Sequence, residues 1–172
     1  TASASDGVVY MVADDGRLYA FGSRAEGLLW EGKVLLEEES LNLTASSGRS
    51  YQVNGSTALA ALVRACEEAN YSLSLNDSLY SLYGLQIDSL GEFNSSGEIS
   101  WRFWINYPRE AMPALGPDIA DLRDGDDVVF YFGDRRARPE DSPRLEISAR
   151  VLLKRPEALF LTVGNRPQIR VA

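Results

Sequence analysis

Histidine is absent from this chain of 172 residues, and cysteine occurs once, as Cys66. Without histidine the chain lacks the commonest general base and the commonest metal ligand in proteins. One cysteine forms neither an internal disulfide nor a thiolate zinc site. These absences exclude Ser-His-Asp hydrolases, Cys-His enzymes and zinc hydrolases. We expect Cys66 to be a small core residue, and we expect no catalytic residue, cofactor or metal site.

Basic residues are also scarce, with 17 lysines and arginines against 25 aspartates and glutamates, a formal net charge of −8. Binding to a polyanion needs a basic face, so nucleic acid is not expected as a partner. The one basic cluster, residues 135–138, is followed by acidic residues and is interpreted as a solvated loop. No apolar run approaches the roughly 18 residues of a membrane span, so no membrane-spanning segment is expected.

Asparagine, in contrast, is placed in a marked pattern. Five of the seven asparagines open an Asn-x-Ser/Thr triplet: Asn42, Asn54, Asn70, Asn76 and Asn94. Serine and threonine occupy 22 positions, so chance gives about one such triplet. One explanation of the excess is a serine-rich chain whose turns happen to contain asparagine, and the other is N-glycosylation. The excess predicts an N-glycosylated extracellular protein, and the small, polar opening residues 1–5 fit a mature chain after removal of a signal peptide.

Strands outnumber helices in the hydrophobic pattern. Residues 8–12 and 18–21 flank Asp14-Asp15-Gly16, a strong hairpin signal. One helix is expected over residues 57–69, with Ser56 or Thr57 as its N-cap and Asn70 at its end. Its apolar stripe has helical spacing and consists of Leu59, Leu62, Val63 and Cys66. Further strands are expected at 33–36, 41–45, 51–53, 85–90, 99–107, 128–132, 145–153, 159–163 and 168–171. This combination predicts an α+β fold with the helix laid across a sheet.

The segment ISWRFWINY, residues 99–107, is the most aromatic part of the chain. Strict alternation places one apolar set on one face of this strand: Trp101, Phe103, Ile105 and Tyr107. Trp104 then lies on the opposite face. Trp104 is either an incidental surface aromatic or, with Tyr107 and Tyr83, a platform for a ring-shaped ligand or a sugar.

Three carboxylates gather in the turn that contains Asp124, Asp126 and Asp127. Their spacing lacks the glutamate at position 12 and the central pattern of a calcium-binding EF-hand loop. In a turn between strands such residues more often serve backbone geometry and solvation than calcium binding.

Several segments occur together in the order LNLTASSGRSYQVN, STALAALVRA, YSLYGLQIDSLGEF and WRFWINYPREAMPALGPDIADLRDGDDVVFYFG. As a set, and over about residues 32–133, they resemble the transcobalamin C-terminal-like family of archaeal and bacterial surface proteins. The resemblance implies a β-grasp fold, a mixed sheet wrapped on one helix, in a superfamily linked to soluble-ligand binding. In transcobalamin relatives this domain closes over cobalamin, and a second, helical domain supplies the other half of the site.

Residues 6–32, which include DGVVYMVADDGRLYAFGSRAEGLLW, resemble one repeat of a quinoprotein-like β-propeller. A propeller needs several blades, and the chain holds no second copy. No cofactor follows from this resemblance. The expected organisation is a β-hairpin extension over residues 1–31, a β-grasp domain over 32–134 and a C-terminal β-strand extension over 135–172.

Two functions fit these observations. The first is a non-enzymatic structural subunit of a cell-surface filament, sheath or surface layer, a homopolymer joined by β-strand addition. The hairpin of residues 8–21 is then the donated element, with assembly residues Val8, Tyr10, Val12, Leu18 and Phe21. The second function is an extracellular ligand-binding module for a cobalamin-like or carbohydrate ligand.

Overall fold

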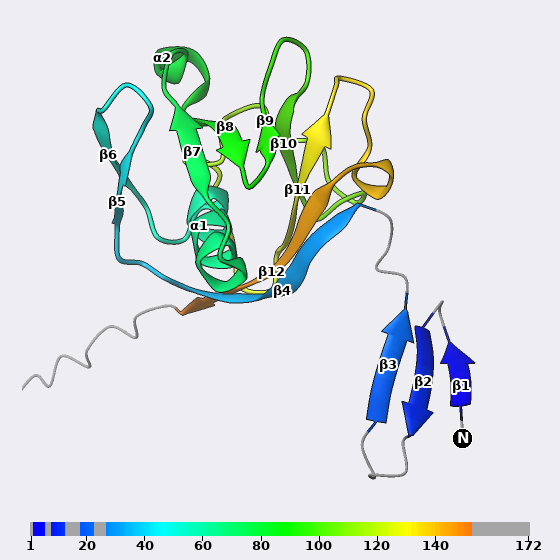
Figure 1. The fold of residues 1–172 in the computed structure, drawn as a ribbon. Coiled ribbons are helices and arrows are strands. Elements are labelled where there is room, and N and C mark those ends of the chain that lie inside the picture. The colour runs from blue at the N-terminus through cyan, green and yellow to red at the C-terminus, as the bar shows by residue number, and fades with distance from the viewer. Residues whose placement is uncertain (1, 6–7, 13–17, 23–26, 153–172) are drawn as a thin grey trace, which may run out of the picture.

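The computed structural model describes residues 2–5, 8–12, 18–22 and 27–152, and for residues up to 22 it describes the backbone alone. It shows a mixed α+β protein, mostly sheet with one long helix, which confirms the predicted fold class (Figure 1). The strands expected at 159–163 and 168–171 lie outside the described residues. No helix in the described part is long and apolar enough to cross a membrane.

Within the described residues the strands form four sheets. Their orders are β1-β2-β3, β10-β11-β12-β4, β5-β6 and β7-β8-β9. The strand bounds are β1 Ala2–Ser5, β2 Val8–Val12, β3 Leu18–Gly22, β4 Leu28–Glu37, β5 Leu41–Thr44, β6 Ser50–Val53, β7 Leu73–Asn76, β8 Gln86–Leu90, β9 Phe93–Asn94, β10 Ser100–Ile105, β11 Asp127–Gly133 and β12 Arg144–Leu152. The helices are α1 Ala58–Ala69, α2 Tyr80–Tyr83 and the 3-10 turn η1 Pro139–Asp141.

The N-terminal sheet contains the expected hairpin, because β2 pairs antiparallel with β3. It also contains β1, which pairs along the other side of β2. Both sides of β2 are therefore occupied, and β1 and β3 form the edges of this sheet. The expected assembly residues lie on the two hairpin strands, and their side chains lie outside the description: Val8, Tyr10 and Val12 on β2, and Leu18 and Phe21 on β3.

The largest sheet joins segments that are far apart in the sequence. Strands β10, β11 and β12 are antiparallel neighbours, and β4 runs parallel to β12 from the Arg144–Leu28 pair to the Leu152–Glu37 pair. The segment boundary expected at 31/32 thus falls inside β4. The boundary expected at 134/135 falls between β11 and β12, which are paired strands of the same sheet. Both expected boundaries therefore lie within the four-stranded sheet.

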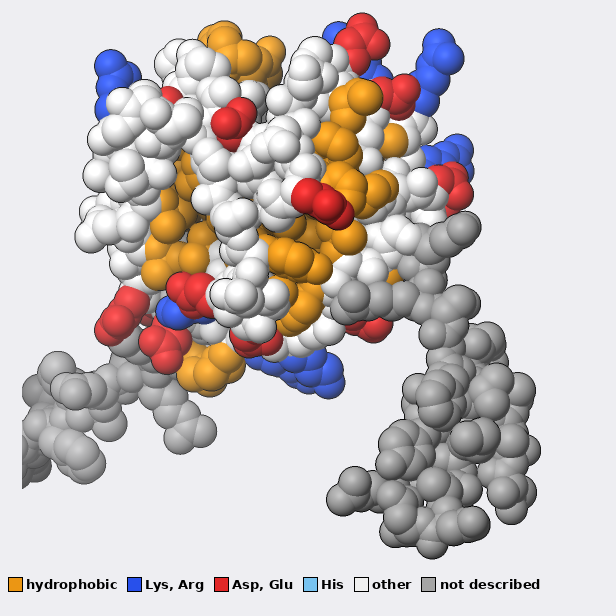
Figure 2. Space-filling model, viewed as in Figure 1, with side chains coloured by type: hydrophobic (Ala, Val, Ile, Leu, Met, Phe, Trp, Pro, Cys, Tyr) orange, Lys and Arg blue, Asp and Glu red, His pale blue; other side chains and the backbone are white. Residues whose placement is uncertain are grey.

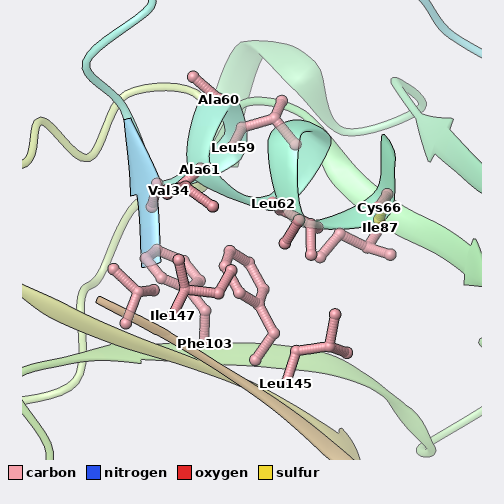
Figure 3. Packing of buried hydrophobic residues seen from close by; sticks show 14 of the residues in the cluster. Val34, Leu59, Ala60, Ala61, Leu62, Cys66, Ile87, Phe103, Leu145 and Ile147 are labelled. Carbon is pink, nitrogen blue, oxygen red and sulfur yellow. The ribbon is translucent and has the colours of Figure 1, made fainter. Parts of the chain in front are cut away.

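Helix α1 supplies the core with its apolar stripe. Thr57 caps its N-terminus, where Oγ1 accepts the N–H of Ala60, and Asn70 ends it in the left-handed conformation. The helix lies against β4 and β12 (Figure 1). Figure 3 shows Leu62 and Cys66 directed toward the side chains of the sheet, among them Leu145. Burying a leucine side chain contributes about 1.5–3 kcal/mol, so this stripe fixes the helix on the sheet.

The β5-β6 hairpin is connected to β7 through one carboxylate. Asp77 accepts hydrogen bonds from the hydroxyls of Ser47 at 2.5 Å and Tyr51 at 2.8 Å. These bonds lower the pKa of Asp77 below its ordinary value, because both hydroxyls stabilise the ionised carboxylate. The contact holds the hairpin beside the sheet that leads into α2.

Candidate functional site

Strand β10 is an edge of the four-stranded sheet, and β8 packs beside it. The N–H of Asn106 points toward β11, where it donates to Asp127 O. The N–H of Trp101 points the other way, away from β11, and donates to Ser95 Oγ at 3.4 Å. In an antiparallel ladder these directions alternate, so the N–H and C=O of Phe103 also point outward. No described residue accepts a hydrogen bond from the N–H of Phe103. The edge therefore presents unpaired backbone groups.

A cleft of about 340 Å³ runs along this edge. We name it the β10 groove, and it lies between residues 86–88 of β8, residues 100–103 of β10 and the loop 112–117, with Tyr83 also in its lining. Ser95 closes one end, because its hydroxyl donates to Ile87 O at 3.0 Å while its oxygen accepts from β10. The groove is thus a gap between two strand edges that one side chain bridges.

The loop side of the groove is anchored at Asp118. Its Oδ1 accepts the N–H of Leu85 at 2.9 Å, and the N–H of Gly116 donates to Tyr83 O at 2.7 Å. Gly84 has φ +81°, and a Cβ placed on it would lie 2.4 Å from Asp118 Oδ1. Only glycine fits this close approach of α2 to the loop. The wall of the groove is accordingly held in place by main-chain contacts.

The rim of the groove is apolar and exposed. It continues from Met112 and Leu115 to α2, where Tyr83 and its neighbours are accessible. Figure 2 shows apolar side chains gathered at the top of the view, where Figure 1 draws α2. The exposed residues of this region are Leu79, Tyr80, Leu82, Tyr83, Met112, Leu115 and Ile119. Exposed apolar patches of this kind mark interaction sites.

A second cleft, of about 370 Å³, lies over β11 and β12 and includes Tyr107 in its lining; we name it the Tyr107 cleft. The Tyr107 hydroxyl donates to Glu140 Oε2 at 2.7 Å. This bond lowers the pKa of the Glu140 carboxyl and raises the pKa of the Tyr107 hydroxyl, because it favours the ionised acid and the neutral phenol. On the floor, Arg144 Nε donates to Glu146 Oε1 at 2.6 Å. The cleft combines an aromatic wall with charged hydrogen-bonding groups.

The three aromatic residues of the predicted platform, Trp104, Tyr107 and Tyr83, do not all lie at one site. Trp104 and Tyr107 meet edge to face, with ring centroids 4.9 Å apart, and Trp104 Nε1 donates to Glu110 O. Tyr83 lines the β10 groove instead. The strict alternation expected for residues 101–107 is wrong at Tyr107, because β10 ends at Ile105 and Asn106 has φ 54°. This left-handed residue turns Tyr107 to the face that carries Trp104.

The five triplet asparagines are distributed over separate turns and strands. Asn42, Asn54, Asn70 and Asn94 are exposed. Asn76 is half-buried and lines the β10 groove, and its Oδ1 accepts the N–H of Ser78 at 2.8 Å. Four of the five side chains therefore have the solvent access that an attached sugar requires.

The carboxylates of the turn at 124–127 are used within the fold. Asp126 accepts from Arg123 N–H and from Asn106 Nδ2, Asp124 accepts from Val151 N–H, and Asp127 accepts from the Ser148 hydroxyl. Over residues 27–152, no group of three acidic, cysteine or histidine side chains is arranged to hold a metal ion.

Sequence reasoning did not identify Ser95, Glu140 or Arg144 as members of these clefts. Glu140 flanks the basic segment 135–138 that was interpreted as a solvated loop, and Arg144 directly precedes the strand expected at 145–153. In the structure η1 and the start of β12 bring both residues to Tyr107. Their signal in the sequence is weak, since only tertiary pairing places them together. Comparison with family models, with curated proteins and with solved structures gave no match for the chain.

Proposed function

We propose that this protein is a non-enzymatic extracellular glycoprotein, a structural subunit of a cell-surface filament, sheath or layer, whose copies join by β-strand addition at β10. The observation that carries the proposal is the outward N–H and C=O of Phe103 beside the β10 groove. An edge strand of this kind is a template for an extended segment from another chain, in which main-chain hydrogen bonds supply affinity.

The rim of the groove supports the same proposal. Leu115 is 50% exposed and Tyr83 is 48% exposed, so an entering strand would bury apolar area now in contact with water. The contact is heterologous, because a strand of one copy enters a groove of the next, and such contacts generate open polymers when the rotation does not close.

The proposal also includes the type of α+β fold. We take the described body, residues 27–152, to be a β-grasp domain of the transcobalamin C-terminal-like family. The mixed sheet with α1 laid on β4 and β12 supports this assignment. Sugar at the exposed triplet asparagines fits a protein that works outside the cell.

The proposal is tested by sedimentation of the full chain over a range of concentrations, with two matched variants. Leu115→Lys adds a charge to the rim of the groove, whereas Leu35→Lys adds the same charge on β4, at the opposite edge of the sheet, where Leu35 is 52% exposed. We expect the parent chain and Leu35→Lys to form large species and Leu115→Lys to sediment as a monomer, because an apolar strand that enters the groove would have to bury the new charge at its rim.

A parent chain that stays monomeric at every concentration would refute the assembly function. If the parent chain polymerises and Leu35→Lys disrupts the polymer while Leu115→Lys does not, the contact lies at β4 and not at β10. Thermal unfolding of both variants serves as the control for folding, since substitutions at exposed sites change stability by about 0.5 kcal/mol or less.

A second candidate function rests on the Tyr107 cleft. Tyr107 lines this cleft together with carboxylates and Arg144, and Trp104 packs edge to face against Tyr107. The cleft thus has the aromatic and hydrogen-bonding groups that saccharides use. Titration calorimetry with neutral oligosaccharides tests this function. Binding that is lost in Trp104→Ala and kept in Tyr83→Ala would support it, whereas an absence of heat from the parent chain would reject it for those sugars.

A further inference from the structure

The β10 groove requires an occupant with specific properties. The outward groups of Phe103 need an extended segment that offers its own N–H and C=O in register. The lining is apolar at Trp101, Met112 and Leu115. Asp88 and Arg102 also line the groove, with one charge of each sign. The segment that fits is therefore a short strand without net charge, with bulky apolar residues and no proline inside it.

Residues 159–163 of this chain have those properties. They read Leu-Phe-Leu-Thr-Val, a β-forming sequence that contains no charge and no proline. Pro156 lies three residues before this apolar run and Gly164 follows it directly. Alternation separates Leu159, Leu161 and Val163 from Phe160 and Thr162, so one side of such a strand is wholly aliphatic.

Charge favours an encounter between this segment and the body of the protein. Residues 153–172 carry four basic side chains and one acidic side chain, a net charge of +3. Residues 27–152 carry 11 basic and 20 acidic side chains, a net charge of −9. Opposite net charges increase the rate of association between the segment and the body of any copy.

Strand β12 ends well beyond the level of its own β10 groove. Leu145 is aligned through Phe130 with Phe103, at the level of the groove, and β12 continues to Leu152. Seven residues of strand advance by about 23 Å. Leu152, the last described residue of this strand, therefore lies about 23 Å beyond the level of the groove.

We infer that residues 159–163 of one copy are the strand donated into the β10 groove of the next. This inference rests on the proposed assembly function and names its donor. In the N-terminal hairpin, which the sequence predicts as the donor, β2 is already paired on both sides, so a contact there could use only the edge strands β1 and β3.

The first test uses full-length chains in a sedimentation assay. Leu161→Pro removes a main-chain donor from the middle of the segment, and Ala172→Pro places the same residue at the end of the chain. We expect Leu161→Pro to abolish polymers and Ala172→Pro to retain them. If the parent polymerises and Leu161→Pro polymerises equally, the donor assignment fails while the assembly function stands. If Leu18→Pro in β3 abolishes polymers and Leu161→Pro does not, the donor is the N-terminal sheet and the inference is overturned.

The second test is disulfide cross-linking, which the buried Cys66 leaves undisturbed. One preparation carries Thr162→Cys, the other carries Gln86→Cys in the groove wall, and the two are mixed and oxidised. We expect a covalent dimer in this mixture and none when Leu35→Cys replaces Gln86→Cys. Equal cross-linking to both partners contradicts the inference. A double Thr162→Cys, Gln86→Cys chain that closes on itself as a monomer also contradicts it, because the segment would then occupy its own groove.

Discussion

Asp118 holds Leu85 in place across the chain: its Oδ1 accepts the Leu85 N–H at 2.9 Å, although 33 residues separate them. Burial is the main reason that the pKa of this carboxyl is raised, and the hydrogen bond from Leu85 opposes the shift. The bond anchors the loop wall of the β10 groove against the start of β8. The position of the wall is therefore linked to the protonation of a single side chain.

The first prediction concerns the pH dependence of this link. Because the pKa of Asp118 is raised in the folded state, its contribution to the free energy of unfolding is fully present below the unfolded aspartate pKa of about 3.9. That contribution is lost as pH rises through the pKa of the folded state. Relative to Asp118→Asn, the parent should lose stability as pH rises above about 4. Asp77→Asn is the opposite control, because the lowered pKa of Asp77 means that the parent loses stability relative to this variant as pH falls. Thermal unfolding over a pH series measures both slopes, and equal slopes would contradict the prediction.

The second prediction concerns the core beneath α1. Leu62 is 0% exposed, and Leu62→Ala should cost about 2–5 kcal/mol in urea unfolding, because it removes buried methyl groups and leaves a cavity. Leu82, which is 64% exposed on α2, provides the matched control. Leu82→Ala should change the free energy of unfolding by about 0.5 kcal/mol or less. Equal losses for both variants would show that α1 does not cover the core in solution.

The third prediction concerns the only thiol. Burial raises the pKa of Cys66 to about 12, and the thiolate is the reactive form. The native chain should therefore resist iodoacetamide at pH 8, and the chain unfolded in urea should take up one carbamidomethyl group. Rapid labelling of the native protein would contradict the buried placement of this residue. Above about pH 9 the buried thiol should also lower stability progressively, because only the unfolded chain ionises there.

The fourth prediction concerns glycan distribution. Asn76 lines the β10 groove, so a sugar there would obstruct an entering strand, and its side chain is already held in a turn by Ser78. In native assembled material Asn76 should carry the least sugar of the five triplet sites, and the exposed Asn42 should carry more. Glycopeptide mass spectrometry measures each occupancy. Full occupancy of Asn76 in polymers would argue against the groove as the contact.

The elements whose signals are local could be predicted from the sequence. The helical spacing of Leu59, Leu62 and Cys66 and the capping residues Thr57 and Asn70 define α1, and the structure confirms them. The parallel pairing of β4 with β12 could not be predicted, because it joins strands more than 100 residues apart and each reads only as an apolar strand.

The candidate site was predicted only in part, for a similar reason. Trp104 and Tyr107 belong to the predicted platform with Tyr83, but alternation placed them on opposite faces of the strand. The face that Tyr107 occupies depends on the positive φ of Asn106, which alternation does not reveal. Ser95 and Glu140 acquire their roles through contacts with Trp101 and Tyr107, and neither contact leaves a periodic pattern in the sequence.

The parallel β4–β12 pair also determines how the body responds to tension. The chain enters this pair at Leu28 and leaves it at Leu152, and parallel pairing places these two points at opposite ends of the ladder. A pull applied through both flanking segments slides β4 along β12, so the hydrogen bonds between them are loaded together rather than opened one after another. For a pull on those two segments of one copy, this ladder is the mechanical clamp of the body, and force spectroscopy of the full chain measures its rupture force.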